Sequence, residues 1–367
     1  MRGVYAILPG GVDDLAAPSG GNRYDRRVCA GLAATGWRVT ELHVDGDWPA
    51  PSKTARARLA STLAAVPDGA PVLIDGLVAC GAPDVVEPAA RRVPLAVLVH
   101  LPLADETGLP ADAAARLDAL ERRTLSAATA VIATSAWTAA RLVEHHGLAP
   151  DRVHVAAPGV DPAPFADATE AGGRLLCVAA LTPRKAQDVL VEALATLSDT
   201  EWTCTFAGAL DRDAAFTSRV RRLVEAHDLD GRARFAGPLA GAALDAAYAA
   251  ADLLVLPSHA ETYGMVVTEA LARGVPVLAT AVGGVAEALG PAERAPDSRA
   301  LGQAGLGVPG KLVPPGDPAA LAAALRSWLT DAGLRQRLRA AARVRRDTLP
   351  SWDATVHAVA GALERMG

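Results

Sequence analysis

Short aliphatic runs alternate with stretches of helical pattern along the whole chain, and this alternation constrains the fold more than any other feature. Residues 95–100 and 253–256 are almost uniformly apolar, as expected of strands that are buried on both faces of a parallel sheet. The series of strands and helices is interrupted by a proline-rich passage at residues 158–164 and then starts again. The sequence therefore predicts an α/β protein with two doubly wound parallel sheets.

The individual elements follow from the same patterns. In the first half we expect strands at residues 4–8, 38–43, 71–74, 95–100 and 130–134, and helices at 22–34, 53–65, 111–125 and 137–145. In the second half we expect strands at 174–178, 203–207, 234–236, 253–256 and 277–280, and helices at 187–197, 213–226, 244–250 and 266–273. Residues 291–310 are rich in Ala, Gly and Pro and are expected to be a surface insertion, and a last helix is expected at 352–364.

Length and composition agree with two domains and exclude several classes of protein. A chain of 367 residues exceeds the usual size of a single core. The net charge of −5 disfavours a nucleic-acid-binding protein. No apolar stretch is long enough to span a membrane, and the first residues resemble a strand rather than a signal peptide. The four scattered cysteines lack metal-ligand spacing and are expected to be reduced core residues of a cytoplasmic protein.

Two glutamates mark the first candidate site. Glu261 and Glu269 flank a glycine turn that follows the predicted strand at 253–256. Gly264 can adopt backbone conformations that are closed to other residues, and the amides of Met265 and Val266 would be free at the start of the next helix. An anion or a hydroxyl-rich ligand binds readily at such a turn. Taken alone, a pair of glutamates is more often a pair of solvated surface groups.

Other polar residues come directly after predicted strands of the first half, where open parallel sheets bind their ligands. Gly20 and Gly21 could present amides to a phosphate or a sugar, or could belong to a flexible loop with Asn22 as a helix cap. His100 ends a buried strand, and we favour a functional role for it. Asp75 could hold an acceptor hydroxyl or cap a turn, and Ser135 resembles a helix cap.

Arg184 and Lys185 are adjacent basic residues on a loop between a predicted strand and a predicted helix. Lysine is otherwise found only at Lys53 and Lys311. Fixed cations in this position could stabilise the negative charge that develops on a departing diphosphate. The alternative is a solvated basic loop.

Several segments together resemble the retaining glycosyltransferases of family 4, the glycosyl transferases group 1. The resemblance is strongest from Ala157 to Asp317 and is carried by five motifs in the expected order. They are Ala157-Pro158-Gly159-Val160-Asp161, Leu181-Thr182-Pro183-Arg184-Lys185, Phe235-Ala236-Gly237-Pro238-Leu239, the segment from Pro257 to Glu287 that contains both glutamates, and Leu312-Val313-Pro314-Pro315-Gly316-Asp317.

This resemblance implies the GT-B fold, with two Rossmann-like domains that face each other across a cleft. Residues 1–160 would bind the acceptor, residues 165–350 would bind a nucleotide sugar, and the helix in 351–367 would pack back on the first domain. The implied activity is a retaining sugar transfer (EC 2.4) from a nucleoside-diphosphate sugar to a hydroxyl of a small molecule. It would need neither a metal nor a cofactor.

The resemblance also assigns roles to residues. Glu269 would bind the ribose hydroxyls, Glu261 would hold the donor sugar, and His100 would contact that sugar. The amides of Gly264, Met265 and Val266 would bind the sugar and the diphosphate. Arg184 and Lys185 would act on the leaving group. The remaining assignments are Pro238 and Leu239 beside the nucleobase, Gly20 and Gly21 at the donor, and Asp75 and Asn22 at the acceptor.

One departure from the family pattern leaves alternatives open. Ala179 and Ala180 stand where the family commonly has Gly-Arg, so either Arg184 supplies the missing guanidinium or diphosphate binding is weakened. A GT-B nucleotide-sugar epimerase and a non-catalytic sugar-nucleotide-binding relative are the alternative functions. A glycoside hydrolase is disfavoured by the nucleotide-type sheets, and a nicotinamide oxidoreductase by the absence of a Gly-X-Gly-X-X-Gly motif after the first strand.

Overall fold

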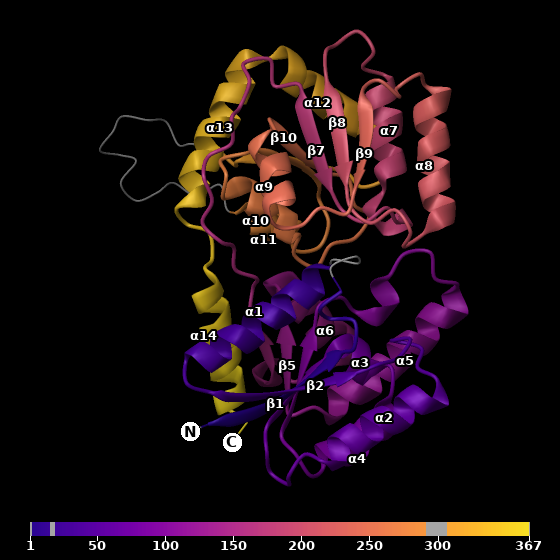
Figure 1. The fold of residues 1–367 in the computed structure, drawn as a ribbon, viewed down its shortest axis with the longest axis vertical. Helices are drawn as coiled ribbons and strands as arrows, with labels where there is room; N and C mark the ends of the chain where they lie inside the picture. The colour runs from indigo at the N-terminus through magenta and orange to yellow at the C-terminus, as the bar shows by residue number, and fades with distance from the viewer. Residues whose placement is uncertain (1, 15–18, 291–306, 367) are drawn as a thin grey trace. The chain divides into compact units, whose positions relative to one another are not determined.

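A computed structural model describes residues 2–14, 19–290 and 307–366 (Figure 1). The described chain forms two compact units. Unit 1 contains the residues up to Asp14, Ser19–Gly159 and the residues from Pro350 onward, and unit 2 contains Val160–Leu349. Most of the predicted insertion at 291–310 lies outside the described residues.

Unit 1 is built on a six-stranded sheet of order β2-β1-β3-β4-β5-β6, and all of its strand pairs are parallel. The central strands β3, β4 and β5 are buried along their whole length, which explains their uniformly aliphatic sequences. The strands are β1 (Gly3–Pro9), β2 (Arg38–Val44), β3 (Val72–Asp75), β4 (Leu95–Val99), β5 (Ala130–Ala133) and β6 (Val153–Val155).

Serine side chains cap four of the helices of unit 1. Ser19, Ser52, Ser135 and Ser351 each accept a hydrogen bond from a first-turn amide, which satisfies a donor that has no partner inside the helix. The C-terminal helix packs against α1. The helices are α1 (Gly20–Ala34), α2 (Lys53–Ala64), α3 (Gly76–Cys80), α4 (Pro83–Ala90), α5 (Ala111–Ala127), α6 (Ala136–His146) and α14 (Trp352–Glu364), with short 3-10 turns η1 (Leu103–Asp105) and η2 (Pro150–Arg152).

Unit 2 also has a six-stranded parallel sheet, of order β12-β11-β10-β7-β8-β9. Strands β10 and β11 are buried along their whole length. The strands are β7 (Arg174–Val178), β8 (Thr203–Ala207), β9 (Ala233–Gly237), β10 (Leu253–Leu256), β11 (Val277–Thr280) and β12 (Gly310–Val313). The two described sheets confirm the predicted fold class of two doubly wound parallel sheets.

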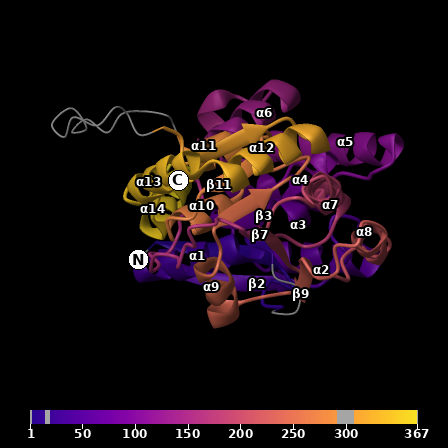
Figure 2. The same ribbon diagram turned by 90° about the horizontal axis from the view of Figure 1, so that it is seen from above.

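The helices of unit 2 cover its sheet, and α7 lies beside both α8 and α12 (Figure 2). Leu190, Leu194 and Trp328 are buried in the core that these helices share with the sheet. The helices are α7 (Gln187–Ala195), α8 (Ala214–Ala226), α9 (Gly241–Ala249), α10 (Met265–Leu271), α11 (Val285–Leu289), α12 (Pro318–Thr330) and α13 (Ala332–Arg346), with the 3-10 turn η3 (Pro183–Lys185).

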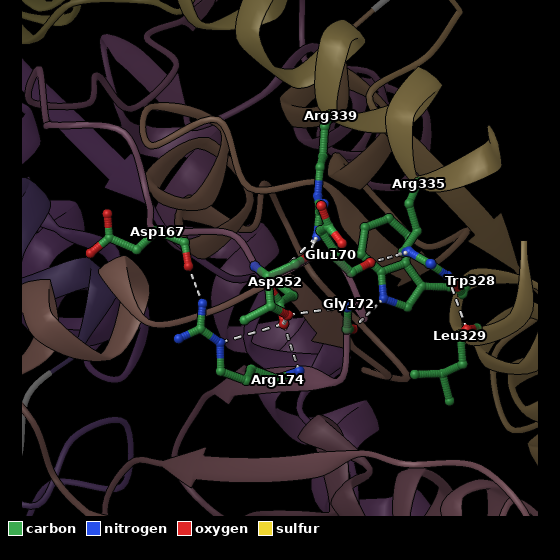
Figure 3. A network of polar contacts seen from close by, with 10 residues as sticks. Asp167, Glu170, Gly172, Arg174, Asp252, Trp328, Leu329, Arg335 and Arg339 are labelled. Carbon is green, nitrogen blue, oxygen red and sulfur yellow. Dashed lines mark hydrogen bonds and ion pairs between the residues drawn. The ribbon is translucent and has the colours of Figure 1, made fainter. Parts of the chain in front are cut away.

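A polar network around Asp252 ties the start of unit 2 to its sheet (Figure 3). The Asp252 carboxylate is buried at the amino end of β10 and accepts hydrogen bonds from the amides of Thr169 (2.6 Å) and Arg174 (2.9 Å). The guanidinium groups of Arg174 and Arg339 lie 3.5 Å from it. This buried charge therefore holds three segments together at the edge of the sheet where the strands begin.

Candidate active site

In both units the predicted site residues follow the carboxyl ends of strands, and several of these strands flank a switch in strand order. In unit 2, β8 and β9 lie on one side of β7, and β10 with its successors lies on the other. In unit 1, the corresponding switch lies between β1 and β3. Helices leave such neighbouring strands toward opposite faces of the sheet, so a crevice opens at their carboxyl ends.

The half-buried Lys185 and the buried Glu261 form an ion pair at the switch point of unit 2. Lys185 ends the η3 turn after β7, and Glu261 lies on the loop after β10. The Nζ atom of Lys185 contacts Oε1 of Glu261, and their side chains are 18% and 8% exposed. The guanidinium of Arg184 lies 4.0 Å from Oε2 of the same carboxylate. The sequence motif thus brings three of the four predicted catalytic side chains together.

Short hydrogen bonds fix the position of this ion pair. The Ser258 hydroxyl donates to Oε1 of Glu261 at 2.8 Å. The backbone of Arg184 accepts a hydrogen bond from the His259 amide at 2.8 Å, and the Arg184 side chain donates to the carbonyl of Ala260 at 3.2 Å. The loops after β7 and β10 are therefore held to each other by a backbone hydrogen bond as well as by the ion pair.

The charge state of Glu261 is set by its neighbours. Burial alone would raise the pKa of this carboxyl group, but Lys185 and Arg184 outweigh burial and hold the pKa below its usual range. Glu261 is therefore a carboxylate at neutral pH. Because two cations face one anion, this part of the site carries a net positive charge, which suits an anionic ligand.

Gly264 begins α10 in the left-handed conformation, with φ 86° and ψ 63°. A Cβ atom at this position would meet no atom closer than 3.5 Å, so the conformation rather than lack of space requires glycine. The first backbone hydrogen bond of the helix runs from the amide of Val267 to the carbonyl of Gly264. Met265 and Val266 are the first two residues of α10, so their amides lie at the start of this helix, as the sequence predicts. The helix starts one residue earlier than expected.

Glu269 lies in α10 and is 7% exposed. Its Oε2 atom accepts a hydrogen bond of 2.7 Å from the hydroxyl of Tyr248, a fully buried residue of α9. The guanidinium of Arg273 donates to the backbone carbonyl of Glu269 at 2.9 Å and packs over the Tyr248 ring. The Glu269 carboxylate is thus held in one orientation and is not a solvated surface group.

Pro238 and Leu239 follow β9, at the same carboxyl edge of the sheet as the ion pair. The ring of Phe235 stacks on Phe206 of β8 at 5.3 Å and fixes the end of β9. Gly237 has φ 72°, which turns the chain sharply before Pro238. Pro238 is exposed and Leu239 is half-buried.

The loop at Ala179 and Ala180, where the family pattern has Gly-Arg, is closely packed by backbone. A Cβ atom on Gly208 would lie 2.0 Å from the carbonyl oxygen of Ala179, so only glycine fits beside this loop. The Gln187 side chain donates to the carbonyl of Ala180 at 3.0 Å. Arg184 and Lys185 are the cationic side chains that the loop after β7 contributes.

In unit 1, the glycines after β1 form the start of α1. Ser19 is the helix cap and accepts a hydrogen bond from the Asn22 amide at 3.0 Å. The prediction of Asn22 as the cap is therefore wrong, because the helix begins two residues earlier, at Gly20. The Asn22 side chain instead donates to the carbonyl of Gly11 at 3.2 Å. A Cβ atom on Gly21 would lie 3.2 Å from the His100 ring, so the start of α1 touches this histidine.

His100 follows β4 and lies beside two buried carboxyl groups. Its Nε2 atom lies 2.8 Å from Oδ1 of Asp25 in α1 and 3.6 Å from Oδ2 of Asp75. Asp75 is the cap of α3 and accepts a hydrogen bond of 2.6 Å from the Leu77 amide. The sequence left a cap and an acceptor contact as alternatives for Asp75, and the cap is observed. Ser135 is likewise the predicted cap of α6.

The pKa values of His100 and Asp75 are both raised in this cluster. Burial alone would lower the pKa of His100, but the charge and the hydrogen bond of Asp25, with Asp75 behind them, raise it to about 9. Burial, and then the neighbouring negative charge of Asp25, raises the pKa of Asp75 to about 7. Near neutral pH the cluster therefore holds a protonated imidazole.

Two groups of side chains within the described ranges have donor atoms close enough to share a metal ion. They are Asp25, Asp75 and His100, and on α5 and α6 the group Asp118, His145 and His146. Hydrogen bonds between histidine and carboxylate already account for both arrangements: Asp25 pairs with His100, Asp118 with His145, and Glu121 with His146 at 3.0 Å. We assign no metal-binding role to either group.

Three residues of these sites were not predicted from the sequence. Asp25 lies on the buried face of α1 together with Tyr24 and Val28, and a charged residue on an apolar face was a usable signal. Tyr248 and Ser258 gave no such signal, because each contacts its glutamate only through the tertiary fold.

Family models match both units. The model of the glycosyl transferases group 1 matches residues 168–345, and that of glycosyltransferase family 4 matches residues 18–164. Within the described residues, no helix combines the length and apolarity that crossing a membrane requires.

Known relatives agree with these matches. A D-inositol 3-phosphate glycosyltransferase of Kineococcus radiotolerans is 35% identical over 257 residues, which cover 65% of this chain and 57% of the relative. The chain spans about half the length of the curated relatives it matches.

Solved structures establish the fold. The sucrose-phosphate synthase of Thermosynechococcus elongatus has a TM-score of 0.79 at 23% identity and covers 100% of this chain and 98% of its own. The Anabaena protein Alr3699/HepE, solved with UDP-glucose, has a TM-score of 0.73 at 20% identity and covers 99% of each chain. With two Rossmann-like units of the GT-B fold and a family match in each, the chain belongs to the group 1 glycosyl transferases of family 4.

Proposed function

We propose that this protein is a retaining glycosyltransferase that moves a sugar from a nucleoside-diphosphate sugar to a hydroxyl of a small molecule. The observation that carries the proposal is the buried contact of Lys185 with Glu261, with Arg184 beside it, at the switch point of unit 2. A half-buried pair of cations at the carboxyl edge of a nucleotide-type sheet suits a diphosphate. In this scheme unit 2 (residues 165–350) binds the donor and unit 1 (residues 1–160, with the helix in 351–367) binds the acceptor.

Lys185 and Arg184 act on the leaving group in this mechanism. As the bond between the anomeric carbon and the diphosphate oxygen breaks, its electron pair moves onto the diphosphate, and the two cations stabilise that charge. The acceptor oxygen attacks the anomeric carbon from the face that the diphosphate leaves. The departing diphosphate oxygen takes the proton of the acceptor hydroxyl, so no separate protein base is required.

The donor is held by groups on both sides of the Gly264 turn. Glu269, oriented by Tyr248, accepts hydrogen bonds from the ribose hydroxyls. Glu261 binds hydroxyls of the donor sugar, and the amides of Gly264, Met265 and Val266 bind the sugar and the diphosphate. Pro238 and Leu239 border the nucleobase. The solved relative Alr3699/HepE holds UDP-glucose, which makes a UDP-sugar the first donor to test, before GDP- and ADP-linked sugars.

Unit 1 contributes His100, Gly20 and Gly21 to the donor, and Asp75 and Asn22 to the acceptor. The curated relatives are named for transfer to D-inositol 3-phosphate, so a polyol or its phosphate is the first acceptor to test. The four cysteines lie buried as free thiols, which fits the reducing cytoplasm.

Two other functions are compatible with the fold. An epimerase would change the configuration of the donor sugar without sugar transfer, and a non-catalytic relative would bind the nucleotide sugar unchanged. Ala179 and Ala180 favour the non-catalytic alternative, because they remove an arginine that the family commonly has. The half-buried cations Arg184 and Lys185, which follow in the same loop, favour the transferase.

A two-step experiment distinguishes the three functions. Thermal shift with a panel of nucleotides and nucleotide sugars identifies the bound donor, because a ligand that binds only the folded state raises the apparent stability. The best donor is then incubated with polyol acceptors, and nucleoside diphosphate release is measured. The transferase releases diphosphate only with an acceptor that becomes glycosylated. Epimerised donor without glycosylated product, or tight binding without any reaction, would contradict the proposal.

A further inference from the structure

The proposed mechanism uses His100 but not the carboxylate beneath it. Asp25 lies in the second turn of α1 and is 1% exposed. Its Oδ1 atom lies 2.8 Å from Nε2 of His100, whereas its Oδ2 atom is buried without a hydrogen-bond partner. The nearest ionisable group besides His100 is Asp75, and one donor atom from each of the three residues lies within 4.8 Å of the others.

A buried carboxylate oxygen without a donor is costly. Among the three groups, the one that can supply a donor is Asp75, if its Oδ2 atom carries a proton. The Oδ1 atom of Asp75 is already used as the acceptor for the Leu77 amide. A single proton between the two carboxyl groups therefore satisfies Asp25 and leaves one negative charge to face the imidazole.

We propose that Asp25 is a positioning residue, whose carboxylate fixes the ring of His100 through Nε2 and keeps that ring a cation. This inference rests on the proposed function, in which His100 contacts the donor sugar. In this proposal Asp25 sets the orientation and the charge of the His100 ring without contacting a substrate itself.

The surroundings of His100 support a fixed cation. From α1 it is faced by Asp25 and by Tyr24, whose ring lies 5.2 Å away edge-on. Burial raises the pKa of the Tyr24 phenol far above its usual value, so this group stays neutral. From the end of β3 it is faced by Asp75. With both carboxyl groups beside the ring, the pKa of His100 is about 9 and that of Asp75 about 7.

The geometry links this charge to the start of α1. The His100 ring lies against Gly21, where even a single methyl group would come within 3.2 Å of it. If Asp25 no longer accepts from Nε2, the ring loses the hydrogen bond that fixes its orientation, and its distance from the first amides of α1 can change. Because the interaction acts through His100, loss of Asp25 should alter turnover more than donor affinity.

The protein offers a matched control for this effect. Glu121 and His146 form a second buried pair of carboxylate and imidazole in unit 1, at 3.0 Å and with side chains 2% and 1% exposed. It lies between α5 and α6 and has no proposed role in the site. Glu121→Gln therefore tests what breaking such a pair does to folding alone.

The experiment is a pH titration of the imidazole nitrogens by NMR in ¹⁵N-histidine-labelled protein, with His100 assigned from the His100→Gln variant. In the wild type we expect His100 to carry both protons up to about pH 8 and to titrate near 9. In Asp25→Asn we expect titration below pH 7, and in Glu121→Gln no change. Titration of wild-type His100 near 6.5, or an unaltered titration in folded Asp25→Asn, would overturn the proposal.

Turnover measured across the same pH range provides the second readout. With Asp25→Asn we expect kcat to fall at least tenfold at pH 8 and to recover toward pH 6, while the donor KM changes less than threefold. Glu121→Gln should keep the wild-type profile. An equal loss of kcat at every pH would show a merely structural role. The NMR titration does not depend on turnover, so its outcome is separate from a failure of the transferase assay. The titration of wild-type His100 can refute the proposal even if Asp25→Asn does not fold.

Discussion

Replacing Lys185 by methionine tests the electrostatics of the proposed site most sharply. Methionine keeps the length of the side chain but removes its charge, which leaves the buried Glu261 carboxylate with Arg184 at 4.0 Å and the Ser258 hydroxyl at 2.8 Å. Loss of one partner from a fully buried pair costs roughly 3 to 5 kcal/mol. Because two partners remain here, we expect about 2 to 3 kcal/mol, which corresponds to a melting temperature lower by roughly 5 to 10 °C for a domain of this size.

Calorimetry of Lys185→Met, Glu261→Gln and the double variant measures this energy. Glu261→Gln removes the stranded charge, so the double variant should be more stable than Lys185→Met alone. In the wild type the pKa of Glu261 is lowered, so its contribution to stability is present above the ordinary glutamate pKa and is lost as the pH falls. In Lys185→Met the destabilisation should therefore shrink at acid pH, where Glu261 becomes protonated. A double variant no more stable than Lys185→Met would refute the reasoning.

Three further outcomes follow from the structure. Glu269→Ala should weaken nucleotide binding by about 1.5 to 3 kcal/mol and Tyr248→Phe by less, as measured by calorimetric titration, and unchanged affinity in a folded Glu269→Ala variant would remove Glu269 from the site. Asp252→Asn should destabilise unit 2 by about 2 to 4 kcal/mol in urea unfolding. Nucleotide affinity should stay unchanged, because Asp252 lies at the end of β10 opposite to the Glu261 loop; weaker nucleotide binding would contradict this separation. The pKa values of Asp75 (about 7) and His100 (about 9) are raised, so both groups stabilise the fold at low pH and lose that contribution as the pH rises through each value. The free energy of unfolding in urea should therefore decline in two steps as the pH rises, and Asp75→Asn should remove the first step and leave the second.

The strands were the most predictable part of this protein. All five strands expected in the second half lie within one residue of β7, β8, β9, β10 and β11. For β10 and β11 the reason is that a strand buried on both faces must be apolar throughout. β6 was missed because its three residues are not buried. The predictions also omitted α3, α4, α11, α12, α13 and β12.

Helix α13 illustrates why sequence patterns fall short. Its arginines suggest a solvated surface helix, yet Arg335 is 9% exposed and donates to the carbonyls of Trp328, Leu329 and Glu170. A guanidinium can be buried when backbone carbonyls surround it, and no local pattern reveals that. The same limit explains the site: Lys185 and Glu261 were predicted because a motif carries them, whereas Asp25 depends on a contact between α1 and the loop after β4.

The most direct test of the account is NMR of a single reaction that contains the protein, its best-binding nucleotide sugar, a polyol acceptor and EDTA. We predict that nucleoside diphosphate and glycosylated acceptor appear in equal amounts, that the product keeps the anomeric configuration of the donor, and that Lys185→Met slows both signals about a hundredfold. An inverted linkage, a requirement for added magnesium, or wild-type turnover in Lys185→Met would contradict a retaining transfer driven by this buried cation.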